Sequence, residues 1–117
     1  MGKVKKAAEF NCPVEATLAV IGGRWKALIL FHLREQTLRF GQLRRLIPGV
    51  SERMLTQQLR ELERAGVVRR EVHAEVTPRV EYSVSEYGRT LRPITDLMCA
   101  WGREHLRRTS GGSGDAC

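Results

Sequence analysis

The sequence predicts a mainly α-helical domain of the α+β class, in which four helices, a β-hairpin and a long final helix follow one another. Three observations predict it. Apolar residues recur at helical spacing up to Gly66, alternate with polar residues from Val68 to Val84, and return to helical spacing after Ser85. A chain of 117 residues is one domain by size, and its 42% of hydrophobic residues is enough for a core.

Charge and composition narrow the function classes. The formal net charge of +7 and the pI of about 10.0 favour an anionic partner, nucleic acid first, with a membrane surface as the competing partner. No apolar run approaches the roughly 20 residues that span a bilayer, and the first residues lack the apolar segment of a signal peptide. We therefore expect a cytoplasmic protein.

Nothing in the sequence indicates an enzyme. The three cysteines are too few for a disulfide framework and lack the paired spacing of a zinc site. The three histidines are dispersed, and no glycine-rich phosphate loop or paired carboxylates stand at a useful spacing. We expect no catalytic residues, no metal and no cofactor.

The folded domain is predicted to cover residues 12–107, between a flexible basic arm at 1–11 and a flexible Gly/Ser tail at 108–117. A first helix begins near Pro13, because proline suits the first helical position, and ends at Gly22-Gly23. The second helix, residues 24–34, is apolar nearly all round, which is typical of the centre of a core. Its apolar residues are Trp25, Leu28, Ile29, Phe31 and Leu33.

Two further helices follow, at residues 40–47 and 51–66, joined by Pro48-Gly49-Val50. Ser51 is a suitable N-cap for the second of them, and Gly66 is the residue type that ends a helix in the left-handed conformation. The inward residues are Phe40, Leu43 and Ile47 in one helix and Leu55, Leu59 and Leu62 in the other. Two short helices joined by a glycine-containing turn are the sequence form of a helix-turn-helix.

The opposite face of the 51–66 helix carries Arg53, Thr56, Gln57, Arg60 and Arg64, within roughly 100° of arc and with no acidic residue among them. Arginine pairs with guanine, glutamine with adenine, and a threonine methyl contacts thymine. A solvated surface is the alternative interpretation. Residues 39–70 also hold eight arginines against three acids. We expect Arg53, Thr56, Gln57 and Arg60 at bases, and Ser51 and Arg64 at phosphates.

The alternating segment predicts a hairpin that forms a wing beside the helix-turn-helix. Its inward residues are Val68, Val72, Ala74 and Val76, then Val80, Tyr82 and Val84, with Thr77-Pro78 in the loop. Arg79 lies near the predicted tip, where we expect it to contact a phosphate.

Ser85 is predicted to cap the final helix, which runs to about Leu106 and has a kink or a break near residues 89–92 because Pro93 removes a backbone donor. This helix carries more apolar surface than the rest of the domain is expected to cover. Met98 and Trp101 are therefore candidates for a dimer interface, with burial in the core of one chain as the alternative.

Cys12 immediately precedes Pro13, at a helix start where the helix dipole favours a thiolate. Lys3, Lys5 and Lys6 would add positive charge if the arm folds back. A reactive thiolate is one interpretation, and a small apolar or capping residue is the other. Cys99 is expected to be buried, and Cys117 exposed.

Three segments together resemble the HxlR-type winged helix-turn-helix transcriptional regulators of bacteria. They are CPVEATLAVIGGRWKALILFHL, RFGQLRRLIPGVSERMLTQQLRELERAGVVRR and PRVEYSVSEYGRTL, and the resemblance covers roughly Cys12 to His105. It implies a homodimer that recognises a partly palindromic operator through one Ser51–Ala65 helix per subunit.

The resemblance also implies that the first and last helices form the dimer interface, which assigns Val14, Leu18, Met98, Trp101 and His105 to it. Some family members sense electrophiles or oxidants through the cysteine that matches Cys12. Two alternatives stay open at this point: a winged-helix module for protein contacts, and a regulator with a signal that is not a thiol modification.

Overall fold

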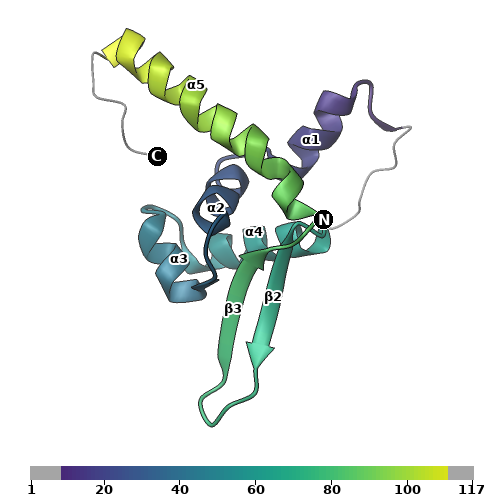
Figure 1. Ribbon diagram of the computed structural model, residues 1–117, viewed down its shortest axis with the longest axis vertical. Helices are drawn as coiled ribbons and strands as arrows, with labels where there is room; N and C mark the ends of the chain where they lie inside the picture. Colours follow the sequence, from purple (N-terminus) through teal and green to yellow (C-terminus); the bar gives the residue numbers. More distant parts are fainter. Residues whose placement is uncertain (1–8, 111–117) are drawn as a thin grey trace.

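The computed structural model describes residues 9–110 and has the predicted α+β architecture (Figure 1). Its helices are α1 (Pro13–Ile21), α2 (Lys26–Leu33), α3 (Phe40–Leu46), α4 (Glu52–Arg64) and α5 (Arg92–Ser110). Its strands are β1 (Leu38–Arg39), β2 (Val68–His73) and β3 (Arg79–Val84), and a 3₁₀ turn, η2 (Gly88–Leu91), precedes α5. Most of the predicted basic arm, including Lys3, Lys5 and Lys6, and most of the predicted tail lie outside the described residues.

The core forms around α2 and the inner face of α4. In α4 the leucines at 55, 59 and 62 are at most 1% exposed, and Ile29 and Leu33 of α2 are at most 2% exposed. They belong to one continuous apolar cluster with residues of α3, β1 and β2. The cluster therefore fixes which face of α4 points outward.

Local signals define the ends of α4. The Ser51 hydroxyl oxygen accepts a hydrogen bond from the Met54 N–H at 3.0 Å, which satisfies one donor of the first turn. Gly66 has a φ of +81°, and the Val67 N–H then donates to the Leu62 carbonyl at 3.1 Å. Both predicted ends of this helix are confirmed.

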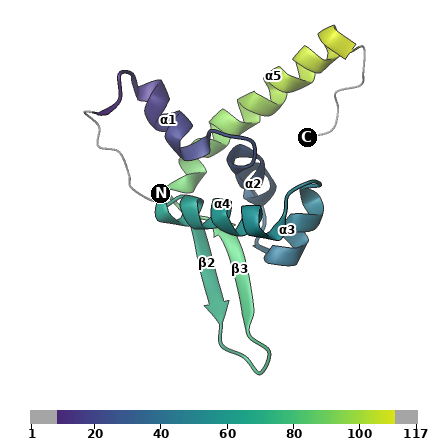
Figure 2. The same ribbon diagram turned by 180° about the vertical axis from the view of Figure 1, so that it is seen from behind.

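The hairpin projects from the body on the side away from α1 and α5 (Figures 1 and 2). The antiparallel sheet has the order β1-β3-β2, with Val68 opposite Val84 and His73 opposite Arg79. The two-residue strand β1 was not predicted, because it is too short to show a period. Val72, Ala74 and Val76 were predicted as inward strand residues but are exposed: Val72 is 53% exposed within β2, and Ala74 and Val76 lie beyond its end.

The junction between β3 and α5 differs from the prediction. Ser85 does not cap α5 but lies before the 3₁₀ turn, where its hydroxyl oxygen accepts from the Gly88 N–H at 2.9 Å and its O–H donates to the Gly66 carbonyl at 2.6 Å. Pro93 is the second residue of α5, where its missing N–H would have no helical partner. The break predicted near residues 89–92 is present, since η2 ends at Leu91 and α5 begins at Arg92, but α5 continues beyond the predicted end at Leu106 to Ser110.

The second helix is less completely buried than predicted. It begins at Lys26 rather than Arg24, Leu28 is 39% exposed, and Phe31 is only half-buried. Leu28 and Phe31 line an open hollow together with Met98 of α5. One side of α2 thus lies at the surface, beside the exposed part of α5.

Gly88 provides a test of the junction, because a Cβ built on it would lie 2.1 Å from the Val67 carbonyl oxygen. We expect Gly88→Ala to lower the free energy of unfolding by roughly 1–3 kcal/mol, as overpacking does. Gly41→Ala is the matched control: a Cβ there meets nothing within 4 Å, so we expect no loss. Urea denaturation of the two variants measures this, and equal stability would contradict the packing described.

Candidate nucleic-acid interface

The outer face of α4 forms one side of an open groove. The groove brings together every helix residue predicted to meet bases, and α3 contributes a half-buried phenylalanine. The lining residues are Phe40, Glu52, Arg53, Thr56, Gln57, Arg60, Glu61 and Arg64. The arginines at 53, 60 and 64 are exposed, whereas Thr56 and Gln57 are half-buried. Three exposed cationic side chains therefore surround two half-buried polar ones.

Ser51 lies at the N-terminal end of this groove and is exposed. Its oxygen is the acceptor in the α4 cap, which leaves its O–H as a donor for an anion. The positive end of the α4 dipole lies at the same place. Arg44 of α3 lies beside this end, 3.8 Å from Glu52, and its Nε donates to the Val50 carbonyl at 3.5 Å.

Two acids border the groove, although the face as predicted held none. Glu61 is the more constrained of them: its Oε1 lies 2.7 Å from Nζ of Lys26, and its Oε2 accepts from Nε2 of Gln57 at 3.3 Å. The hydrogen bond from Lys26 lowers the pKa of Glu61, so the carboxylate is charged and its charge is matched by the lysine. Lys26 is the residue that sequence reasoning missed, since it lies on another helix.

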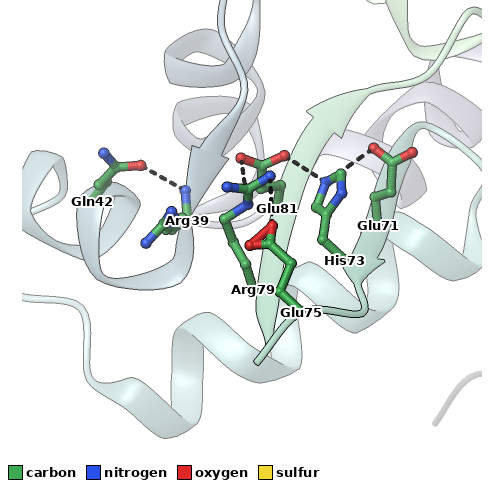
Figure 3. A network of polar contacts seen from close by, with 7 residues as sticks. All are labelled: Arg39, Gln42, Glu71, His73, Glu75, Arg79 and Glu81. Atoms are coloured by element: carbon green, nitrogen blue, oxygen red, sulfur yellow. Dashed lines mark hydrogen bonds and ion pairs between the residues drawn. The ribbon is translucent and has the colours of Figure 1, made fainter. Parts of the chain in front are cut away.

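The wing holds a second polar network (Figure 3). Arg79 lies at the start of β3, where Nη2 is 3.4 Å from Glu75 and Nε is 3.5 Å from Glu81. On the other side of Glu81, His73 places Nε2 at 2.8 Å, and Glu71 lies 3.5 Å from the same nitrogen. Arg79 is therefore held by two carboxylates rather than extended alone toward solvent.

These acids change the expected charge of the wing. Residues 68–84 contain three arginines and three glutamates, so the hairpin carries no formal net charge. Its exposed free cations, Arg69 and Arg70, lie at the base of the wing near α4, not at the tip. Ligand atoms of Glu71, His73 and Glu81 lie within 4.8 Å of one another, which is a spacing that a metal ion can use, but His73 and Arg79 already partner these carboxylates.

The predicted dimer residues all lie at the surface. Val14 and Leu18 of α1 are 61% and 57% exposed, and Met98 and Trp101 of α5 are 49% and 70% exposed. The ring of His105 stacks on Trp101, with centroids 5.0 Å apart. The alternative of burial in the core of one chain does not hold, because these side chains are outside it.

Cys12 is the N-cap residue of α1, exposed and free. Its thiol makes no capping hydrogen bond, whereas its carbonyl accepts from the Glu15 N–H at 2.9 Å. Cys99, expected to be buried, is half-buried on α5, and its sulfur accepts from Arg103 at 3.4 Å. Cys117 lies outside the described residues.

Comparisons with known proteins also point to a helix-turn-helix regulator. Residues 20–110 match the HxlR-like helix-turn-helix family. The HTH-type transcriptional regulator YtcD of Bacillus subtilis (strain 168) is 53% identical over 103 residues, which is 88% of this chain and 82% of YtcD.

Two solved structures are similar in fold. The redox regulator HypR in its oxidized form has a TM-score of 0.77 and 53% identity, covering 80% of this chain and 96% of HypR. The reduced form of the transcriptional regulator YodB from B. subtilis has a TM-score of 0.71 and 32% identity, covering 88% of this chain and 99% of YodB. Among the described residues, no helix is long and apolar enough to cross a membrane.

The contact between Lys26 and Glu61 predicts a pH-dependent contribution to stability. The pKa of Glu61 is lower in the folded state than its ordinary value of 4.5. The contact therefore adds to the free energy of unfolding at pH values above 4.5, and this addition is lost as the pH falls through the lower, folded-state pKa. We expect Glu61→Gln to cost on the order of 1 kcal/mol at pH 7, and less at pH 3. Urea denaturation at the two pH values measures this.

Glu63→Gln is the control, since Glu63 is exposed and has no ion pair recorded within residues 9–110. It should change stability little at either pH. A cost for Glu61→Gln that is the same at pH 3 and pH 7 would contradict the assignment.

Proposed function

Because the chain belongs to the HxlR-like helix-turn-helix family, whose members are transcriptional regulators and not enzymes, we propose that it binds duplex DNA sequence-specifically as a homodimer. One α4 of each subunit would enter the major groove of a partly palindromic operator, with half-sites about 34–36 Å apart. The observation that carries the proposal is the outer face of α4, where exposed arginines flank Thr56 and Gln57 above a fully buried leucine face. Such a regulator would work in the cytoplasm, beside the chromosome.

The residues of this face fall into two groups, those proposed to contact bases and those proposed to contact phosphates. Arg53, Thr56, Gln57 and Arg60 are proposed to contact base edges, which present a distinct pattern for each base pair in the major groove. Ser51 and Arg64, at the two ends of α4, are proposed to contact phosphates. Arg79 is proposed to add a weaker phosphate contact, since Glu75 and Glu81 compete for its guanidinium.

The dimer is proposed to form through α1 and α5. Both helices extend from the side of the body opposite the wing tip (Figure 2), and both expose large apolar side chains. Several large apolar side chains exposed on neighbouring helices are typical of a protein interface. Its position leaves the α4 groove of each subunit open to DNA. The interface residues are proposed to include Val14, Leu18, Met98, Trp101 and His105.

Cys12 is proposed to carry a thiol signal, through oxidation or electrophile modification. Its thiol is exposed and free at the N-terminal end of α1, a helix of the proposed interface. A change at this position would shift DNA binding if it stabilises one arrangement of the two subunits over another. The similar protein HypR is named a redox regulator.

A winged-helix module used only for protein contacts is the competing function. It would bind random and operator DNA equally weakly, so selection of bound sequences from random duplexes separates the two. The net positive charge of the groove favours DNA: its lining has three arginines against two acids, and one of these acids, Glu61, is already paired with Lys26.

We expect Arg60→Ala to reduce discrimination at defined base pairs by about 1–3 kcal/mol, because a bidentate base contact is lost. Binding to the selected operator and to random duplex DNA is measured by fluorescence anisotropy. Arg89→Ala removes the same charge from the exposed surface of η2, outside the groove and the proposed dimer helices, and is the control. Equal losses on the two DNAs for Arg60→Ala would remove Arg60 from the base-reading set.

Trp101→Asp should convert the dimer to a 13.3 kDa monomer, because a carboxylate would be buried at the proposed interface. Sedimentation velocity measures the change. Val76→Asp introduces the same charge at a fully exposed position of the wing and should leave the dimer intact. A dimeric Trp101→Asp protein would place the interface elsewhere.

Oxidant should change operator affinity in the wild type and leave the Cys12→Ser variant unchanged, since serine cannot form a sulfenic acid or a disulfide. Operator binding is measured before and after treatment with hydrogen peroxide or diamide. If the two proteins respond identically, the signal does not act through Cys12.

A further inference from the structure

A chain of polar contacts connects the interior of the fold to the DNA-facing side of α4. It begins at Lys26, the first residue of α2, whose side chain is 15% exposed. Its Nζ lies 2.7 Å from Oε1 of Glu61, whose side chain is 24% exposed. The other carboxylate oxygen of Glu61 accepts from Nε2 of Gln57 at 3.3 Å. Three side chains from two helices thus form one connected unit.

The chemistry of this unit selects one orientation of the Gln57 amide. A glutamine amide presents an acceptor oxygen and a donor nitrogen that exchange places when the group flips. A carboxylate accepts hydrogen bonds and donates none, so only the nitrogen can face Glu61. The flipped amide would place two oxygens against each other. The order of donor and acceptor that Gln57 presents along the groove is therefore fixed by Glu61.

Lys26 keeps Glu61 charged and in place, so that Glu61 can hold the Gln57 amide in this orientation. Without Lys26, the partly buried carboxylate of Glu61 would have no ion pair to offset its desolvation, and DNA phosphates would repel it. The ion pair matches the charge and also anchors Glu61, because Lys26 opens the helix that carries the buried residues Ile29 and Leu30. The hydrogen bond from Lys26 keeps the pKa of Glu61 low, so the carboxylate stays an acceptor at neutral pH.

We propose that Lys26 and Glu61 are positioning residues for sequence recognition, which hold Gln57 in one amide orientation and so sharpen its preference for a base pair that neither of them touches. The inference rests on the proposed function, because it assumes that Gln57 faces DNA. It adds a determinant of specificity on α2, a helix outside the helix-turn-helix.

The test uses a variant that keeps the total charge unchanged. Lys26→Met combined with Glu61→Met removes one positive and one negative charge, and replacing such a pair by apolar side chains of similar size is often neutral for stability. Bound sequences are selected from random duplex DNA with the wild type, the double variant, Gln57→Ala and Lys26→Met alone. Affinities for every single-base variant of the selected operator are then measured, along with thermal unfolding.

We expect the double variant to lose about tenfold or more of its discrimination at the same base pair where Gln57→Ala loses it. Its affinity for random DNA should stay within about twofold of the wild type, because its net charge is the same. Lys26→Met alone should lose that discrimination and also weaken binding to all sequences, since Glu61 is left unpaired near the phosphates. A purely structural role for the pair would lower thermal stability and affinity without acting on one base pair.

The outcomes separate the inference from the function on which it rests. If the wild type selects no sequence, the proposed function fails. If the wild type selects an operator and Gln57→Ala alters it at a defined base pair, while the double variant keeps the wild-type preference there, the positioning role is overturned. The positioning role is also overturned if the double variant loses discrimination evenly at all base pairs of the operator.

Discussion

Burial of one face of α4 determines where the other face points, and the proposed DNA interface depends on that single constraint. The leucines at 55, 59 and 62 occur at helical spacing and are almost completely enclosed by the cluster around α2. Truncating such a side chain typically costs about 2–5 kcal/mol, so rotation of α4 about its axis is strongly disfavoured. The arginines, Thr56 and Gln57 consequently lie on the outward face of α4, along the groove.

The sequence predicted the parts of this interface that depend on local signals. Ser51, the leucine stripe and Gly66 lie within one helix and its ends, and the structure has all three in the predicted roles. The contact between Lys26 and Glu61 was not predicted, because the two residues lie on different helices and only the packing of α2 on α4 brings them together. Its consequence for Gln57 was hidden for the same reason.

The charge of the wing is a second property that the sequence did not predict correctly, because it depends on how the two strands pair. Arg79 suggested a cationic tip, but the β2–β3 register places Glu81 beside it and opposite Glu71, so the local charges largely cancel. Cations that remain outward, Arg69 and Arg70, lie nearer to α4. At the other side of the body, the apolar residues of α1 and α5 were recognised in sequence, and only the structure distinguishes their exposure from burial in the core.

Methylation interference on the selected operator tests most directly whether α4 reads bases in the major groove. Dimethyl sulfate modifies guanine N7, which faces the major groove, and adenine N3, which faces the minor groove. The account predicts that guanine N7 methylation blocks binding in two clusters about 10 base pairs apart, on one face of the duplex. Interference confined to adenine N3, or no interference at either position, would contradict it.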